Sequence, residues 1–306
     1  ISMDLQASRV VFQPNLLTSK SKKNKKKDGS VRGILDGWIN SFFKPSTIVK
    51  RLDGSGTFTK ELQNGMHVRA YINKINKAFN ALVEDCNKFK ASYKDYSHLW
   101  EKDMQTTFDE FLVGATTETT DTGLKLYDLK KFDTEIARYR DIQSQIADLR
   151  TPTDICWLRV NSQPIKQALN TQATKWNYMF TQHLHNDIVQ KLTKLNEFCT
   201  RIDDGLDREV PDGDVDSLMA VMGDIRDIRK RQDETSAMFE PLRECINLLK
   251  KHGISMDGAM IGEMELMDYL ENAPLRWDGI INKAYKKKED IMNLQNSEAE
   301  SIKARL

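Results

Sequence analysis

One short stretch has residue types that could hold a phosphate group. Asp53 to Thr57 (DGSGT) resembles half of a phosphate-binding loop, in which glycines let backbone N–H groups reach the phosphate oxygens. A complete loop also needs a Gly-Lys pair, and the chain has none. The nucleotide-binding hypothesis therefore fails, and we expect an ordinary loop here.

A second stretch, DGDVDS, places Asp212, Asp214 and Asp216 at alternate positions, as in a calcium-binding loop. Such a loop needs glycine at its sixth position and glutamate at its twelfth. The chain has Ser217 and Gly223 there. We expect Asp214 instead to cap a helix, because a carboxylate satisfies the free N–H groups of a first turn.

Histidine and cysteine spacings do not predict a metal or catalytic site. His183 and His185 are two residues apart on an expected helix, so they point to nearly opposite sides. His252 directly precedes Gly253. We expect a helix to end here, because a cationic histidine complements the negative end of the helix dipole and glycine readily adopts the left-handed cap conformation. We expect no catalytic, cofactor-binding or metal-ligating residues, with a site built from scattered residues as the alternative.

The four cysteines are widely spaced and form no C-x-x-C pair. Three of them, Cys86, Cys199 and Cys245, fall on apolar helical faces, where a free thiol behaves as a small hydrophobic group. Cys156 is the fourth. The pattern predicts thiols in a reducing compartment rather than disulfides.

Charged surfaces are the remaining candidates for partner contacts. The formal net charge is +1, which favours neither nucleic acid nor an anionic membrane. No apolar run approaches the roughly 18 residues that span a bilayer. The candidate contacts lie in a lysine-rich loop, an acidic turn and a basic helix face: Lys22, Lys23, Lys25, Lys26, Lys27, Asp207, Asp212, Lys286, Lys287 and Lys288. The lysine run could instead be a phosphate-binding or nuclear-localisation patch, or a solvated insertion.

Long helices must position these residues. Apolar residues between Val68 and Trp100 recur at alternating steps of four and three, which is a heptad seam typical of a helix packed against other helices. Burying the seam would stabilise the fold by about as much free energy as the loss of conformational entropy costs when these residues are ordered. We therefore expect a partner helix to cover the seam. Its ten positions are Val68, Ile72, Ile75, Phe79, Leu82, Cys86, Phe89, Tyr93, Tyr96 and Trp100.

Five further helices are predicted from the same kind of pattern. One has a stripe of Ile34, Leu35, Trp38, Ile39, Phe42 and Phe43 and is interrupted near Pro45. A second runs from about Leu129 to Leu149, ended by Pro152. A third runs from about Pro164 and buries Ile165, Leu169, Ala173, Trp176, Phe180, Leu184, Ile188, Leu192, Leu195, Cys199, Ile202 and Leu206. A fourth runs from Val215 towards Phe239, and a last one carries Trp277, Ile280 and Ile281 on its apolar face.

Two kinds of stretch separate these helices. Pro241 is predicted to mark a bend between two packed helices, because Phe239, Leu242 and Ile246 keep one face across it. The stretches SRVVFQPNL and ICWLRVN are predicted as short strands or extended links, and Gly114 to Gly123 as a loop.

The predicted fold class is all-α, an elongated array of antiparallel helical bundles with a few short extended segments. We expect an N-terminal segment with the lysine-rich loop over 1–30, a first bundle over 31–150, a second over 151–253, and the start of another over 254–306. Because the chain opens with Ile1 and has no signal-peptide pattern, we interpret it as a fragment.

Several stretches together resemble the tail of dynein heavy chains, of the axonemal outer-arm type and most of all its beta form. They are GWINSFFKPSTIVKRL, YKDYSHLWEKDMQTTFDEFL, CWLRVNSQPIKQALNTQATKWNYMFTQHL, RQDETSAMFEPLRECINLLKKHG and LRWDGIINKAYKKKEDIMNLQNSEAESIK. The resemblance covers roughly residues 8 to 306, except the lysine run. No single stretch is a sharp motif, and their order and spacing make the case.

The resemblance implies a parent chain that is a microtubule motor with its ATP sites elsewhere, so this fragment would be non-catalytic and without a cofactor. It implies a location in the cytoplasm and in the axoneme of a cilium or flagellum. The implied partners are other dynein heavy chains, intermediate and light chains, and docking proteins on the doublet microtubule, with no nucleic acid and no membrane. A spectrin-like or other tethering adaptor unrelated to motors, and an enzyme with an unrecognised site, are the alternatives.

Overall fold

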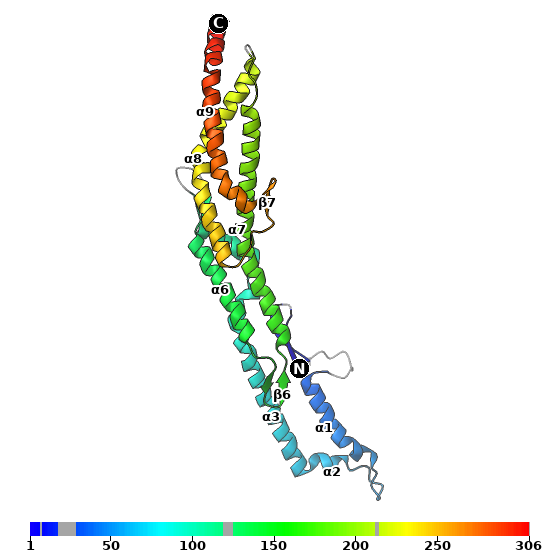
Figure 1. Ribbon diagram of the computed structural model, residues 1–306. Coiled ribbons are helices and arrows are strands. Elements are labelled where there is room, and N and C mark those ends of the chain that lie inside the picture. The colour runs from blue at the N-terminus through cyan, green and yellow to red at the C-terminus, as the bar shows by residue number, and fades with distance from the viewer. Residues whose placement is uncertain (7, 18–28, 119–124, 212–213, 306) are drawn as a thin grey trace. The chain divides into compact units, whose positions relative to one another are not determined.

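The computed structural model describes residues 1–6, 8–17, 29–118, 125–211 and 214–305, with side chains as far as residue 292. Helices dominate the described residues, and the strands form only short antiparallel pairs (Figure 1). The helices are α1 (Val31–Ile48), α2 (Thr59–Asn64), α3 (Met66–Ala91), the 3₁₀ helix η1 (Ser92–Tyr96), α4 (His98–Glu101), α5 (Met104–Ala115), α6 (Leu129–Asp148), α7 (Gln163–Leu206), α8 (Val215–Lys251) and α9 (Leu266–Arg305). The prediction of an all-α protein with short extended segments is confirmed.

The described residues contain four two-stranded antiparallel sheets, one before the first helix and three between helices. Their strands are β1 (Ser2–Gln6), β2 (Arg9–Gln13), β3 (Thr116–Glu118), β4 (Lys125–Tyr127), β5 (Thr153–Ile155), β6 (Leu158–Val160), β7 (Met260–Ile261) and β8 (Met264–Glu265). The two stretches predicted as strands or extended links are thus strands β2 and β6. The loop predicted from Gly114 begins with the last two residues of α5 and continues as strand β3, because Thr116–Glu118 pairs with Lys125–Tyr127. Residues 119–124 lie outside the described residues.

The chain divides into two compact units. The first contains Ile1–Met104 and Tyr139–Trp176, and the second contains Gln105–Arg138 and Asn177–Leu306. Helices α6 and α7 contribute residues to both. Each unit thus contains two separate stretches of the chain. The bundle boundaries expected at 150 and 253 stay predictions.

The apolar face of α7 supplies core residues to each unit. All twelve side chains predicted for this face are buried, from Ile165 to Leu206. In the first unit, Trp176 stacks on Tyr139 with ring centroids 5.4 Å apart, and its indole N–H donates to the Leu99 carbonyl at 3.2 Å. Burial of a continuous apolar stripe is the main source of stability for such a long helix.

Both ends of α8 follow the expected capping chemistry. Asp214 is the N-cap, and its carboxylate accepts a hydrogen bond from the Ser217 backbone N–H at 3.2 Å. At the other end, Gly253 has φ of +66°, the left-handed conformation that glycine adopts at low cost. The predicted roles of Asp214 and Gly253 are confirmed.

The predictions that two helices meet at Pro241 and that a helix is interrupted near Pro45 were wrong. Helix α8 continues through Pro241 as a single element, and α1 continues through Pro45 as far as Ile48. Proline removes one backbone donor from a helix, but packing can still hold the flanking turns in helical geometry. Phe239 and Leu242 are buried on either side of Pro241 and fix both turns.

The heptad seam is only partly α-helical, and only some of its side chains are buried. The α-helix α3 ends at Ala91 and tightens into η1, where the Ser92 hydroxyl donates to the Phe89 carbonyl at 2.7 Å in competition with the helical pattern. Seam residues Phe79, Leu82, Cys86 and Tyr93 are buried. The first three positions of the seam are not, so the expectation that the whole seam is covered was wrong.

No helix in the described part of the chain combines the length and the hydropathy that crossing a bilayer would require.

Candidate functional site

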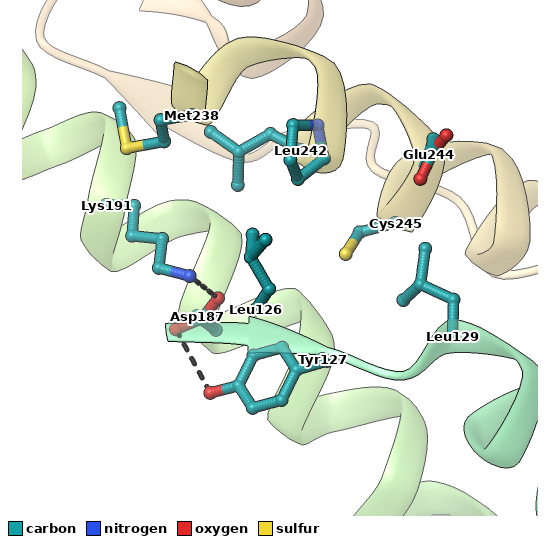
Figure 2. Close-up of a pocket in the computed structure, with 10 residues that line it drawn as sticks. Leu126, Tyr127, Leu129, Asp187, Lys191, Met238, Leu242, Glu244 and Cys245 are labelled. Carbon is teal, nitrogen blue, oxygen red and sulfur yellow. Dashed lines mark hydrogen bonds and ion pairs between the residues drawn. The ribbon is translucent and has the colours of Figure 1, made fainter. Parts of the chain in front are cut away.

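One pocket lined by potentially reactive side chains lies in the second unit, between strand β4 and helices α7 and α8 (Figure 2). It has a volume of about 100 Å³. Its lining residues are Leu126, Tyr127, Leu129, Asp187, Lys191, Met238, Pro241, Leu242, Glu244 and Cys245. A thiol, a phenol, a carboxylate and an ammonium group in one pocket could in principle do acid–base or nucleophilic chemistry.

Three polar side chains of this pocket, Tyr127, Asp187 and Lys191, are already paired with one another. The Tyr127 hydroxyl donates to the Asp187 carboxylate at 3.4 Å, and the Lys191 ammonium pairs with the same carboxylate at 2.8 Å (Figure 2). Lys191 also lies 5.3 Å from the centre of the Tyr127 ring. These contacts fasten strand β4 to α7.

Burial also keeps the two potential nucleophiles protonated. It raises the pKa of the Cys245 thiol to about 12 and that of the Tyr127 phenol to about 12. A catalytic thiol instead has its pKa lowered, so that the thiolate is present near neutral pH. The pocket therefore favours a structural role, and Pro241 is part of its wall.

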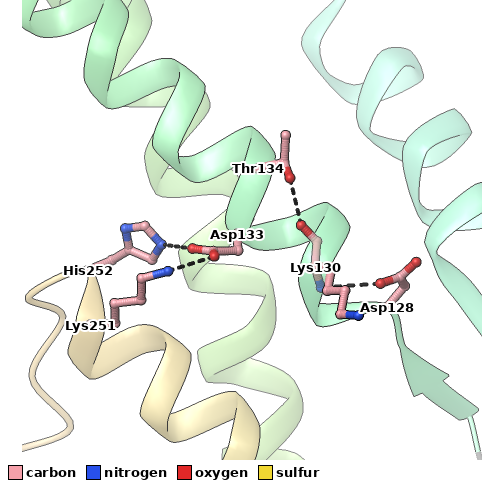
Figure 3. Close-up of polar contacts among 6 residues, drawn as sticks. All are labelled: Asp128, Lys130, Asp133, Thr134, Lys251 and His252. Atoms are coloured by element: carbon pink, nitrogen blue, oxygen red, sulfur yellow. Dashed lines mark hydrogen bonds and ion pairs between the residues drawn. The ribbon is translucent and has the colours of Figure 1, made fainter.

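A second polar cluster joins the start of α6 to the end of α8 (Figure 3). Asp133 accepts hydrogen bonds from the Lys251 ammonium and contacts the His252 ring nitrogen Nε2, each at 2.7 Å. The hydrogen bonds from Lys251 and then His252 lower the pKa of the Asp133 carboxyl. Sequence reasoning placed His252 at a helix end but missed Asp133, because the two residues are 119 positions apart.

Two of the predicted contact surfaces touch each other within the second unit. Asp207, from the acidic turn, pairs with the Lys283 ammonium at 2.8 Å, and Lys283 also pairs with Asp203 at 2.5 Å. Lys287, from the basic face of α9, donates to the Arg208 carbonyl at 2.7 Å. These contacts hold the end of α7 to α9.

Of the other predicted contact residues, two are exposed on α9 and six lie outside the described residues. Lys286 and Lys288 are exposed, and Lys288 borders a shallow cavity beside Ile225 and Ile228. The five lysines of the lysine-rich loop and Asp212 lie outside the described residues. The role of all these residues in partner binding stays a prediction.

Within the described residues, no group of three or more potential ligands is placed to hold a metal ion. His183, for which the sequence predicted no metal-binding role, lies among aromatic rings, 5.2 Å from Phe108 and 5.4 Å from Tyr127 between ring centres. Its Nε2 contacts the Tyr127 hydroxyl at 3.2 Å.

Protonation of His183 is expected to destabilise the second unit. Burial lowers the pKa of His183 below its ordinary value of 6.5. The Asp187 carboxylate opposes this shift in part, whereas the Lys191 ammonium adds to it. Above pH 6.5 the imidazole is neutral in both states and contributes no pH dependence. As the pH falls below that value, the unfolded chain binds the proton first, so the free energy of unfolding decreases.

The measurement is urea denaturation at pH 5, 6 and 7 for the unaltered chain and for His183→Gln. We expect the variant to lose less stability between pH 7 and pH 5. Equal losses would show that His183 does not titrate differently in the folded and unfolded chain.

The four thiols are expected to differ sharply in reactivity. Cys86, Cys199 and Cys245 are buried, as predicted, whereas Cys156 is exposed. The Cys156 thiol donates to the Asp85 carboxylate at 3.5 Å, and this bond raises its pKa. Burial raises the pKa of Cys199 to about 11.

At pH 8, a thiol reagent should therefore label Cys156 in the native chain and the other three only after denaturation. Mass spectrometry of the labelled peptides measures this directly, and Cys156→Ser should abolish native labelling. Rapid native labelling of Cys199 or Cys245 would contradict the packing described here.

The fold and these contacts define an α-helical bundle protein whose conspicuous polar clusters join helices. Among known proteins, the chain is similar over nearly its whole length to axonemal dynein heavy chains. It is 29% identical to the beta chain of the flagellar outer-arm dynein of Chlamydomonas reinhardtii, an alignment that covers 99% of this chain. It is 26% identical to dynein axonemal heavy chain 11 of Sus scrofa over 97% of its length, and 26% identical to the ciliary dynein beta chain of Heliocidaris crassispina over 98%.

These matches confirm the resemblance found in the sequence: the chain is similar to axonemal dynein heavy chains, including the flagellar outer-arm beta chain. It spans about 7% of the length of each of these curated relatives. No protein-family profile matches the chain. Nothing in these comparisons supports the alternative of an adaptor unrelated to motors.

Proposed function

We propose that this chain is a non-catalytic part of the tail of an axonemal dynein heavy chain, which serves assembly with other dynein chains and transmits force. One observation supports this most: the alignments take in 97–99% of this chain but only about 7% of each relative. In a motor of that size, the ATP sites and the microtubule-binding region lie elsewhere, so this segment itself needs no cofactor.

Helix packing suits a load-bearing role. A continuous buried stripe along α7 and a close pairing of α8 with α9 resist bending, because bending would open well-packed apolar contacts. The clusters around Asp133 and around Lys283 add polar connections between helices. Such a segment passes force along its helices without a reaction of its own.

The relatives' names refer to flagellar and ciliary dyneins and to an outer arm. By analogy, we place this chain in the cytoplasm and in the axoneme of a cilium or flagellum. The partners we propose are other dynein heavy chains, intermediate and light chains, and docking proteins on the doublet microtubule.

Two experiments test this proposal. The purified chain should show no ATP hydrolysis above buffer, and turnover that increases with protein concentration would contradict a non-catalytic role. Cross-linking mass spectrometry on the intact dynein should join this segment to other dynein chains. Cross-links confined to the heavy chain itself would contradict a role in assembly.

A further inference from the structure

Helix α1 leaves a row of large apolar side chains in solvent. Ile34, Trp38, Phe42 and Ile48, which we call the α1 stripe, are 43%, 68%, 58% and 69% exposed. Their spacing places them on one side of the helix, over a length of about 21 Å at about 1.5 Å per residue. The sequence pattern had predicted most of this row as a packed face. Single exposed apolar residues are ordinary, but a row of this length with a tryptophan at its centre is typical of a binding surface.

The first half of α3 is also incompletely covered. The heptad seam continues through Val68, Ile72 and Ile75, but Val68 and Ile72 are only partly buried and Ile75 is 39% exposed. Helices α1 and α3 both contact α2, which joins them in the first unit (Figure 1). A heptad seam packs against helices, because its knobs fit the holes between side chains of a facing helix. We therefore expect the element that packs on this part of the seam to be a helix.

The charged residues around these helices indicate which charge the partner carries. Residues 31–83 contain eight Lys and Arg residues but three Asp and Glu residues. The three acidic groups are engaged locally: Asp36 with Arg32, Glu61 with Arg51, and Asp53 with the Ser55 hydroxyl. Five lysines are exposed and make no ion pair within the described residues: Lys44, Lys50, Lys60, Lys74 and Lys77. Lys44 lies on α1 itself, four residues before Ile48 and so on the same side of the helix. A partner with acidic residues beside its apolar face complements this charge.

We propose that the α1 stripe binds an amphipathic α-helix of a partner chain, apolar along one face and rich in Glu and Asp along its edges. The α1 stripe inserts into the apolar face of that helix as a ridge into a groove, and the lysines pair with the acidic edges. This inference specifies the chemistry of one partner and rests on the assembly role proposed above for its biological setting.

The test uses the whole chain and a labelled synthetic peptide of about 20 residues, which is about 30 Å long as a helix. The peptide carries Leu at i, i+3, i+4 and i+7 positions, with Glu at the flanking positions. Fluorescence anisotropy should show saturable binding that weakens with added salt. The double variant Trp38→Ser/Phe42→Ser should bind about tenfold more weakly or worse. The matched control Tyr178→Ser, which removes an aromatic ring that is 62% exposed on α7, should bind as the unaltered chain does.

Charge reversal tests the electrostatic part separately. Lys44→Glu/Lys60→Glu should bind the Glu-flanked peptide more weakly and gain affinity for a peptide with Lys in place of Glu. Lys286→Glu/Lys288→Glu, on α9, should change neither affinity. Circular dichroism of each variant establishes that its helices are retained.

Three results would overturn the inference: equal binding of the Lys-flanked peptide to the unaltered chain, unchanged binding by Trp38→Ser/Phe42→Ser, or binding to anionic vesicles in place of the peptide. Dimerisation of the chain that Trp38→Ser/Phe42→Ser abolishes would assign the α1 stripe to a second copy and would also overturn it. None of these results bears on the cross-links expected in the intact dynein, so this inference can fail while the proposed function stands.

Discussion

Replacement of Trp176 by alanine is expected to destabilise the first unit by about 3–5 kcal/mol, the range for a large buried aromatic residue. Trp176 is 1% exposed, stacks on Tyr139 with an interplanar angle of 4°, and donates its indole N–H to the Leu99 carbonyl. The substitution therefore removes a stacked pair, leaves a cavity and deprives a buried carbonyl of its donor. These effects act together at one point where α6, α7 and α4 meet.

The variant Trp176→Phe separates these contributions. It keeps an aromatic ring against Tyr139 but leaves the Leu99 carbonyl without its donor, so we expect a smaller loss of about 1–3 kcal/mol. Hydrogen exchange of amides in the first unit measures the local free energy of opening for both variants. Trp157→Ala is the control, because Trp157 is 54% exposed and its loss should cost no more than about 0.5 kcal/mol. A loss below about 1 kcal/mol for Trp176→Ala would contradict the packing described here.

Helix α7 shows how much of the fold can be predicted from the sequence. Its apolar residues recur with helical spacing from Ile165 to Leu206, and every one of the predicted positions is buried. The same local logic identified Asp214 as an N-cap and Gly253 as a left-handed terminus. Such features depend on a few neighbouring residues, so periodicity and capping preferences suffice to find them.

Helix α1 shows where sequence reasoning fails. Its apolar stripe predicts a packed face, and the pattern cannot say whether the packing partner belongs to the same chain. Proline is the second difficulty: at Pro45 and Pro241 a local rule predicted a break, but both prolines lie inside helices. At Pro241 the buried side chains of Phe239 and Leu242 hold the flanking turns. Periodicity indicates which side of a helix is apolar, but what covers that side depends on the tertiary structure.

The polar clusters could not be predicted for a related reason. Asp133 contacts His252, and Asp207 contacts Lys283, across long separations in the sequence. Charged residues are so frequent in this chain that no local signal distinguishes these pairs. The fold brings Asp207 to Lys283 on α9 and Lys287 to the Arg208 carbonyl, so two surfaces that the sequence presented as separate candidates lie against each other.

The second large effect is expected from Phe132→Ala in the second unit. Phe132 is fully buried and lies 5.0 Å from Phe111, 5.6 Å from Tyr127 and 6.2 Å from Phe180 between ring centres. Its ring also stacks on His183 at 6.4 Å. Loss of this ring removes the centre of an aromatic cluster, and we expect a cost of about 3–5 kcal/mol.

The same substitution should change the titration of His183. The imidazole has a lowered pKa chiefly because it is buried, so a cavity that admits water beside it should raise that pKa towards the ordinary value. NMR titration of the His183 ring protons in the unaltered chain and in Phe132→Ala measures this shift. Phe132→Leu is the matched control, because it fills most of the cavity and should cost less stability while it changes the His183 pKa less. A large loss of stability with an unchanged His183 pKa would mean that the cluster collapses around the missing ring, and the proposed link between burial and titration would be wrong.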